Sequence, residues 1–309
     1  MNEPRFQPRR ELGKTGFAVT RVGIGDLADR TVPLETCVAT LRRAFHFGLN
    51  LVDTAPSYED GYSERIVGAA LIGRRSSVFL IDKVDHFDRP VLPQIGESLE
   101  RLGVDATDLF VLHGVSSLEQ WRTVTAPGGV WDELVACRAA GKSRFVGISS
   151  HHPEVLDDAL DTGRSDVVMF PVGPFVDARY TERILPKARS LGVGTVCFKT
   201  FGAGKLLGDT EGYGRELSSR PRGKLSSGGV DHAAPTLPRL SVSECVRYTL
   251  TLDPDVALLG MSFPNEQDAA LSAVDSFKPM GPAELAAVRE RAQAAIRDKG
   301  ACWWNPADG

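Results

Sequence analysis

The chain has 309 residues, of which 42% are hydrophobic and 25% charged, and these values are ordinary for a globular protein. Its formal net charge of −4 gives no global electrostatic reason to expect nucleic acid or a membrane surface as a partner. We expect a cytoplasmic protein with reduced thiols, because the five cysteines form no CxxC pair, the first residues do not resemble a signal peptide, and no apolar run reaches the ~18 residues of a membrane span.

Short apolar runs alternate along the chain with longer segments whose apolar residues recur every three or four positions. The first pattern predicts strands and the second predicts amphipathic helices. A small hairpin is expected at 9–23. In chain order, we then expect a strand at 20–25, helix 34–48, strand 50–54, helix 63–73, strand 77–84, helix 91–103, strand 107–114, helix 128–141, strand 143–150, helix 153–163, strand 165–172, helix 181–192, strand 193–199, a long loop at 209–240, helix 241–253, strand 256–260, helices at 266–274 and 282–300, and a tail at 300–309.

These elements form eight strand–helix units, whose strands are apolar throughout, as expected when both faces of a parallel sheet are buried. They predict a (β/α)8 TIM barrel, as one domain spanning 1–309 with an N-terminal β-hairpin and an extra C-terminal helix. A doubly wound dinucleotide-binding sheet is disfavoured, because GIGDLADR lacks the third glycine of GxGxxG. KTFGAGKLL is no P-loop, since Lys199 replaces the first glycine and Leu206 replaces the final Ser or Thr.

Four polar side chains stand at or just after the ends of three consecutive predicted strands. Asp53 closes the second barrel strand, and Tyr58 follows in its loop. Lys83 closes the third strand and His113 the fourth. Because TIM barrels carry their chemistry at the carboxyl ends of the strands, we expect these four side chains to meet at one mouth of the barrel.

This combination of groups suits the reduction of a carbonyl. A tyrosine, with a pKa near ~10, is a poor acid at neutral pH, but a neighbouring ammonium stabilises the phenolate and lowers that pKa. A carboxylate keeps the ammonium charged, and an imidazole can hydrogen-bond the carbonyl oxygen. Since no side chain supplies a hydride, a nicotinamide cofactor is implied.

Other interpretations of the same residues stay open. Taken singly, the aspartate can cap a helix or pair with a cation, the lysine can contact phosphate or solvent, and the histidine can be a satisfied structural group. Two functional alternatives concern the whole set. The barrel can be a cofactor-binding redox sensor with little turnover, or Lys83 can form a Schiff base in a lyase.

The segments NLVDTAPSYEDGYSE, IDKV and LFVLHG resemble motifs of the aldo-keto reductases, which are TIM-barrel, NAD(P)H-dependent enzymes with an Asp-Tyr-Lys-His tetrad. The resemblance covers nearly the whole chain. It implies that Asp53, Tyr58, Lys83 and His113 form the tetrad. Tyr58 is then the general acid or base, Lys83 and Asp53 are its pKa partners, and His113 is the donor that orients the substrate. The implied substrate is a small aldehyde, ketone or sugar lactol.

The resemblance further implies that NADP(H) or NAD(H) lies extended across the barrel mouth. The residues expected to contact it lie at or near the carboxyl ends of the first, fifth, sixth, seventh and eighth barrel strands. They are Gly25, Asp26, Ser149, Ser150, Met169, Phe198, Lys199, Phe201, Gly202, Gly204, Lys205, Gly260, Ser262, Phe263, Glu266 and Gln267.

Some of these positions have a second interpretation. Ser150 stands where the family usually has asparagine and can instead cap the helix at 153–163. Met169 stands where the family commonly has glutamine, and it cannot donate to the carboxamide. Phe198 either stacks on the nicotinamide or packs only in the core.

The last barrel strand bears on the choice of cofactor. Family members that prefer NADP(H) usually place Arg or Lys just after Gly260, to pair with the 2′-phosphate, whereas this chain has Ser262 and Phe263. Glu266 would repel a 2′-phosphate and accept a hydrogen bond from a free 2′-hydroxyl. We therefore expect NAD(H) to be used at least as well as NADP(H), although an alignment shifted by one residue puts Gln267 in the binding position.

Two further features have no single interpretation in the sequence. The loop at 209–240, which contains RPRGKLSSGG, is either a lid over the pyrophosphate or a solvated loop. The tail at 300–309 either covers the substrate mouth or packs on the outer helices. We expect no metal site, because the adjacent His151 and His152 lack HExxH spacing and a third ligand.

Overall fold

The computed structural model describes residues 9–25, 30, 32–208 and 237–306. In this part of the chain, eight parallel strands close into a barrel in sequence order, and the last strand pairs with the first. They are β3 (Val22–Gly25), β4 (Leu51–Asp53), β5 (Phe79–Val84), β6 (Thr107–Leu112), β7 (Ser143–Ser149), β8 (Val167–Pro171), β9 (Gly194–Phe198) and β10 (Val256–Leu259). The predicted TIM barrel is therefore confirmed, with slightly shorter strands than the sequence predicts.

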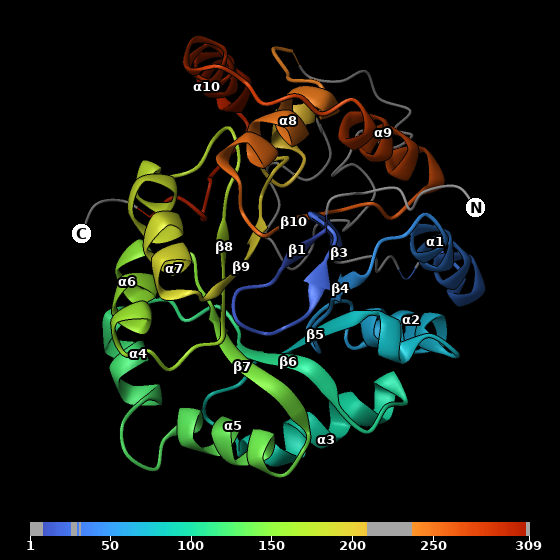
Figure 1. Cartoon of the computed structure of the whole chain (residues 1–309), viewed down its shortest axis with the longest axis vertical. Coiled ribbons are helices and arrows are strands. Elements are labelled where there is room, and N and C mark those ends of the chain that lie inside the picture. The colour runs from blue at the N-terminus through green and yellow to red at the C-terminus, as the bar shows by residue number, and fades with distance from the viewer. Residues whose placement is uncertain (1–8, 26–29, 31, 209–236, 307–309) are drawn as a thin grey trace.

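Helices surround the barrel on its outer side (Figure 1). They are α1 (Leu34–His46), α2 (Tyr62–Leu71), α3 (Val91–Leu102), α4 (Leu118–Val124), α5 (Val130–Ala139), α6 (Pro153–Asp161), α7 (Leu185–Leu191), α8 (Val242–Leu252), α9 (Pro264–Asp275) and α10 (Pro282–Ile296). Short 3-10 turns at Arg75–Ser77 and Lys205–Leu207 and a π-helical turn at Tyr180–Ile184 supplement them. Helix α10 is the predicted extra C-terminal helix.

Helix α4 is absent from the predicted elements. It lies between β6 and α5, so this connection contains two helices where the sequence predicts one. Trp121 of α4 packs edge-on against Trp131 of α5, with 5.6 Å between the ring centres. Both rings belong to one buried cluster with Phe110 of β6 and Val146 of β7, so the two helices together cover this part of the barrel.

The predicted N-terminal hairpin is formed by the antiparallel strands β1 (Arg10–Glu11) and β2 (Ala18–Val19), and it lies across the centre of the barrel in Figure 1. Leu12 is fully buried in the cluster that fills the barrel interior. A Cβ atom on Gly13 would lie only 2.3 Å from the backbone nitrogen of Gly194, the first residue of β9. The hairpin therefore closes the amino end of the barrel.

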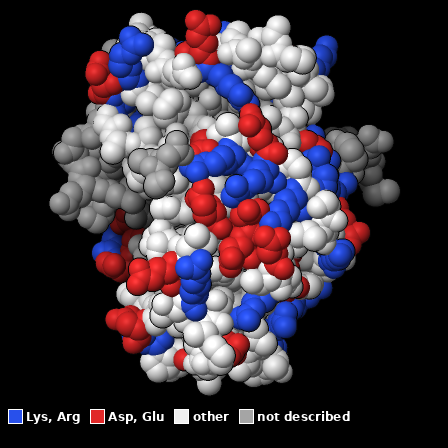
Figure 2. Space-filling view, turned by 90° about the vertical axis from the view of Figure 1, so that its left-hand side faces the viewer, with Lys and Arg blue, Asp and Glu red and all other residues white. Residues whose placement is uncertain are grey.

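One face of the molecule, formed by the elements on the left of Figure 1, has acidic and basic side chains next to each other (Figure 2). Ion pairs hold many of these groups. Nη1 of Arg179 lies 2.5 Å from Oε1 of Glu154 in α6, and Nζ of Lys187 in α7 lies 2.7 Å from Oδ1 of Asp157. This face consequently has no extended field of a single sign.

The five cysteines all lie in the described part of the chain and are free, as their scattered spacing predicts. Four of them are buried and Cys302 is half-buried. None of the helices described here combines the length and the apolar character that crossing a membrane requires.

Candidate active site

The carboxyl ends of β4, β5 and β6 bring the four predicted catalytic side chains to the carboxyl end of the barrel. The innermost contact joins Lys83 to Asp53, with 2.7 Å between Nζ and Oδ1. Nζ also donates to the backbone carbonyl of Thr54 at 2.6 Å. The lysine and aspartate side chains are only 2% and 4% exposed, so this is a buried ion pair fixed by two neighbouring strands.

The charge state of this pair follows from its burial and its partners. Burial by itself lowers the pKa of Lys83, but the Asp53 carboxylate and the Tyr58 side chain raise that pKa above its ordinary value. Burial also raises the pKa of Asp53, although Lys83 acts to lower it, and the raised pKa favours a neutral carboxyl group. The two tendencies conflict. Because Nζ has two oxygen acceptors within 2.7 Å, the geometry supports a charged ammonium paired with a carboxylate.

Tyr58 lies half-buried on the loop between β4 and α2, in contact with this pair. Nζ of Lys83 is 4.5 Å from the centre of its ring, and the His113 ring meets it edge-on with 5.9 Å between ring centres. The Tyr58 N–H donates to the Ala55 carbonyl at 3.1 Å, and the Ser63 N–H donates to the Tyr58 carbonyl at 3.3 Å. The structure thus brings the four predicted groups together in one cluster and anchors the loop that carries the phenol.

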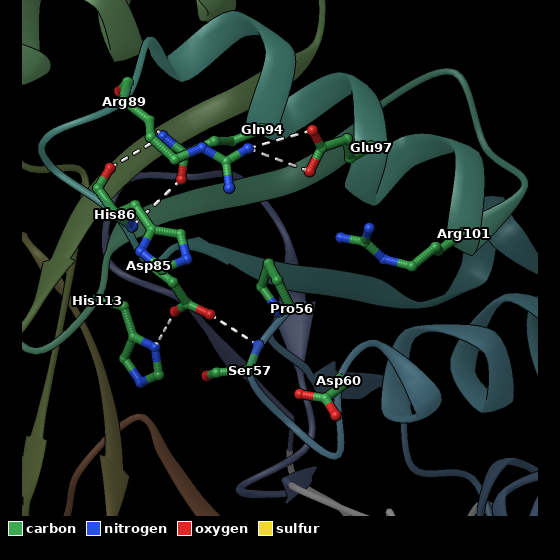
Figure 3. A pocket seen from close by; sticks show the side chains of 10 residues that line it. All are labelled: Pro56, Ser57, Asp60, Asp85, His86, Arg89, Gln94, Glu97, Arg101 and His113. Carbon is green, nitrogen blue, oxygen red and sulfur yellow. Dashed lines mark hydrogen bonds and ion pairs between the residues drawn. The ribbon is translucent and has the colours of Figure 1, made fainter.

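Asp85, which the sequence-based prediction does not include, links two parts of this cluster (Figure 3). Its Oδ1 contacts Nδ1 of His113, and its Oδ2 accepts a hydrogen bond from the Ser57 N–H at 2.7 Å. Burial raises the pKa of Asp85, but the bonds with His113 and Ser57 outweigh burial and lower the pKa to about 2. Asp85 directly follows the last residue of β5, and this position at the end of a barrel strand is the signal that the sequence offers for it.

A cavity of about 620 Å³ opens beside the cluster, between the loops that follow β4 and β5 and helix α3 (Figure 3). Ser57, Asp85 and His113 line one end of it, and Glu97 and Arg101 of α3 line the other. The tyrosine and lysine of the cluster are not part of its lining, so the cavity adjoins the cluster rather than enclosing it. Its size and its polar walls suit a small polar molecule.

Asp26 lies outside the described residues. The other residues predicted to contact a cofactor lie within the carboxyl halves of β3 and of β7 to β9, or in the segments that follow β7, β9 and β10. Gly25 and Gly260 are half-buried at the mouth, and Ser149 is buried at the end of β7. The Ser150 hydroxyl donates to the Val115 carbonyl at 2.7 Å and accepts from the amide that precedes α6 at 3.0 Å. The Ser150 side chain is therefore engaged within the protein, but it does not cap α6, whose N-cap residue is His152.

The predicted nicotinamide neighbours on β8 and β9 differ in their surroundings. Met169 is 1% exposed and belongs to the apolar cluster inside the barrel. Phe198 is half-buried at the end of β9, and its ring centre lies 5.2 Å from that of His151. Phe198 therefore faces the mouth beside another ring, whereas Met169 packs below it.

In the turn after β9, backbone N–H groups donate to carbonyl groups of the same turn. The Gly202 N–H donates to the Lys199 carbonyl at 2.9 Å, and the Gly204 N–H donates to the Phe201 carbonyl at 3.1 Å. Lys199 has a left-handed backbone, with φ of 71°, which tightens this turn. The two glycine amides that the sequence assigns to a pyrophosphate are thus bonded within the turn.

Lys205 and the C-terminal tail form one packed unit beside this turn. Lys205 is fully buried, and its Nζ donates to the Ala301 carbonyl at 2.6 Å. Trp304 is also fully buried, and its indole N–H donates to the Phe175 carbonyl in the segment after β8 at 2.8 Å. The described part of the tail therefore packs against the segments that follow β8 and β9, and Lys205 is turned toward the tail. The loop residues 209–236 lie outside the described residues.

Glu266 and Gln267, the two candidates for the adenosine end, are both bonded within the protein. Glu266 accepts the Ser262 N–H at 2.7 Å and the Phe263 N–H at 3.3 Å through Oε2. Burial raises its pKa to about 8, against the effect of these two bonds. The Gln267 amide donates to the Thr40 carbonyl at 2.8 Å, and its oxygen accepts from an arginine of α1 at 3.0 Å. Gln267 thus connects α9 to α1.

Four buried side-chain atoms near the ends of β7, β9 and β10 have no hydrogen-bond partner in the described structure. They are Nε2 of His151, Oγ1 of Thr200, Oγ of Ser262 and Oε1 of Glu266. Buried polar atoms normally have a partner. A ligand that carries both donors and acceptors along this edge would satisfy them, so the residues present fit a dinucleotide here.

His151 is a neutral ring in this environment. Burial, with the nearby charges of Lys199, His113 and His152, lowers its pKa to about 3. Within the described ranges, no group of three or more His, Cys, Asp and Glu side chains is arranged to hold a metal ion.

Comparisons with known proteins agree with this geometry. The model of the Aldo/keto reductase family matches residues 21–273. The chain is 28% identical to L-galactose dehydrogenase of Arabidopsis thaliana over 294 residues, which cover 88% of this chain and 89% of the relative. It is 27% identical to the NADH-specific methylglyoxal reductase of Escherichia coli over 226 residues, which cover 64% of this chain and 68% of the relative.

Solved structures share the fold of this chain. The holo form of aldo-keto reductase AKR11C1 from Bacillus halodurans superimposes with a TM-score of 0.70 at 25% identity, over 94% of this chain and 98% of the other. An aldo-keto reductase from Klebsiella pneumoniae in complex with NADPH shares the fold with a TM-score of 0.67 at 20% identity, over 91% and 94% of the two chains. The chain therefore belongs to the aldo/keto reductase family and is an NAD(P)(H)-dependent oxidoreductase.

Proposed function

We propose that this enzyme interconverts an aldehyde, a ketone or a sugar lactol with the corresponding alcohol or lactone, with Tyr58 as the general acid in reduction and the general base in oxidation. The nicotinamide cofactor supplies or accepts the hydride when it is bound. Tyr58 then gives its proton to the oxygen that gains negative charge, and His113 orients that oxygen.

The observation that carries this proposal is the buried pair of Lys83 and Asp53 against the Tyr58 ring. An ammonium 4.5 Å from the ring centre stabilises the phenolate, which makes the phenol a stronger acid. Asp53 keeps the ammonium charged at a site that is almost closed to water. The same pairing disfavours a Schiff-base lyase, because a charged amine is not a nucleophile.

For the cofactor, we propose that the dinucleotide lies along the barrel mouth from Ser149 past Phe198 to Ser262. It would supply hydrogen-bond partners for the buried polar side-chain atoms that lack them in this region. We propose that NAD(H) serves at least as well as NADP(H). No basic side chain stands between Gly260 and α9, and the ionised form of Glu266 repels a 2′-phosphate. Because the pKa of Glu266 is about 8, this repulsion grows as the pH rises through that value.

Two relatives support the substrate class by their names. One is a dehydrogenase of L-galactose and the other is a methylglyoxal reductase that is specific for NADH. Together they cover oxidation of a sugar and reduction of a small dicarbonyl.

A cofactor-linked absorbance screen over aldehydes and aldoses, run with NADH and NADPH, tests the proposal. The wild type is expected to turn over at least one member of the screen. Tyr58→Phe removes only the hydroxyl, so it is expected to lower turnover by about 10²–10⁴-fold. Cofactor binding without turnover across the screen would instead support a redox sensor, and undiminished turnover by Tyr58→Phe would refute the role of the phenol.

A further inference from the structure

Asp85 connects two catalytic segments that are separate in the sequence. Its Oδ2 holds the N–H of Ser57, directly before Tyr58, at 2.7 Å, and its Oδ1 meets Nδ1 of His113. The side chain is 8% exposed, whereas His113 is 25% exposed. A largely buried carboxylate thus fixes both the start of the tyrosine segment and the orientation of the imidazole.

We infer that Asp85 is a positioning residue that holds the His113 proton on Nδ1, so that Nε2 donates a hydrogen bond to the substrate only when the ring is an imidazolium. The inference rests on the proposed function, because it assigns the form of His113 that binds a carbonyl.

The assignment of the proton follows from the chemistry of the two groups. An ionised carboxylate only accepts hydrogen bonds, so the ring nitrogen that contacts it must carry a hydrogen. The low pKa of Asp85, about 2, keeps its carboxylate ionised at neutral pH. A neutral imidazole has one N–H, and here that N–H is at Nδ1. Nε2 of the neutral ring therefore has a lone pair and accepts a hydrogen bond.

This tautomer changes what His113 can do. Figure 3 shows its second ring nitrogen directed away from Asp85. A carbonyl oxygen has no hydrogen to donate, so it gains nothing from an acceptor at Nε2. The imidazolium, with hydrogens on both nitrogens, donates to Asp85 and to a carbonyl oxygen at the same time. The neutral ring instead pairs with a hydroxyl group of the substrate or with water.

The other groups that face His113 do not supply this effect. Tyr58 meets the ring edge-on from the loop after β4, and Asp53 acts on it from β4 through its charge. His151, after β7, has a pKa of about 3 and remains neutral over the working pH range. Asp85 is thus the group whose direct contact selects the ring nitrogen that carries the proton.

The variant Asp85→Asn gives a sharp test, because Ser57 fixes the orientation of the new amide. The Ser57 N–H needs an acceptor, so the asparagine oxygen takes that bond and its NH₂ group faces His113. Nδ1 then accepts, and the neutral ring moves its proton to Nε2. Nitrogen-15 NMR of labelled histidine distinguishes the two tautomers in the folded protein without any substrate. We expect the Nδ1–H form in the wild type and the Nε2–H form in Asp85→Asn.

The control is Glu97→Gln, which neutralises another acid of the same cavity without contact to His113 and is expected to keep the wild-type tautomer. An Nε2–H tautomer in the wild type, or an unchanged tautomer in Asp85→Asn, overturns the inference. The NMR measurement of the tautomer needs no turnover, so its result is independent of the proposed function.

Kinetics provide the second readout. In the wild type, kcat/KM for carbonyl reduction is expected to fall as the pH rises, because the neutral ring cannot donate from Nε2. In Asp85→Asn, the neutral ring still donates from Nε2, so this fall is expected to disappear. A substitution that merely loosened the loop would lower the rate at every pH and keep the fall. Retention of the wild-type pH profile in Asp85→Asn contradicts the inference.

Discussion

The buried pair of Lys83 and Asp53 makes a prediction about stability as well as activity. The substitution Lys83→Met keeps the length and the apolar stem of the side chain but removes its charge. The side chains of the pair are 2% and 4% exposed, so the carboxylate left behind has little access to water. Removing one partner of such a pair costs about 3–5 kcal/mol of unfolding free energy. In a chain of this size, each kcal/mol of lost stability lowers the melting temperature by ~2 °C, so the expected decrease for Lys83→Met is ~6–10 °C.

The assay is thermal unfolding at neutral pH, with the double variant Asp53→Asn/Lys83→Met as the control. The double variant leaves neither position of the pair charged, so it should recover most of the stability that Lys83→Met loses. Both variants should lack activity, since neither has an ammonium beside Tyr58. An unchanged melting temperature in Lys83→Met would mean that Asp53 is already neutral. A double variant no more stable than the single one would refute the explanation through an uncompensated carboxylate.

Further predictions concern Glu266 and two helical glycines. The pKa of Glu266 is raised from 4.5 to about 8 in the folded state. Its protonated form therefore stabilises the fold fully below pH ~4.5, and this contribution is lost as the pH rises to about 8. Glu266→Gln should flatten this decline in the free energy of unfolding, as measured by urea denaturation. In the wild type, but not in this variant, kcat/KM with NADPH relative to that with NADH should fall as the pH rises through about 8, where the folded enzyme ionises Glu266. Gly68→Ala in α2 should destabilise the protein by ~1–3 kcal/mol, because the added Cβ would lie 2.2 Å from the Leu102 carbonyl oxygen. Gly96→Ala in α3 should stabilise it by up to ~1 kcal/mol, because the added Cβ would meet no atom outside its own helix within 4 Å.

The barrel could be predicted from the sequence because each strand is short, apolar and followed by a helical pattern. Asp53 and Lys83 interrupt apolar runs at the ends of two such strands, so their convergence follows from the closure of the barrel. Helix α4 could not be predicted in the same way. It is short, and its position depends on the packing of Trp121 against Trp131, which no local pattern encodes.

The contacts around the site were less predictable, because they join residues far apart in the chain. Asp85 acts through His113, 28 positions away, and its residue type alone gives no sign of that partner. Lys205 looks like a phosphate ligand beside glycines, but its ammonium bonds the Ala301 carbonyl in the C-terminal tail. The Ser150 hydroxyl likewise bonds a protein group, the Val115 carbonyl. A residue type near a strand end identifies a candidate, and the tertiary contacts decide whether its polar atoms remain available.

The most direct test of the central claim is a single-turnover measurement of hydride transfer. The enzyme is first saturated with NADH or NADPH and then mixed with a carbonyl substrate found in the screen, while the reduced nicotinamide is followed by its absorbance. Tyr58→Phe is expected to slow this step by about 10²–10⁴-fold, with an unchanged dissociation constant for the cofactor. Transfer by Tyr58→Phe at the wild-type rate would contradict the assignment of the phenol as the proton donor.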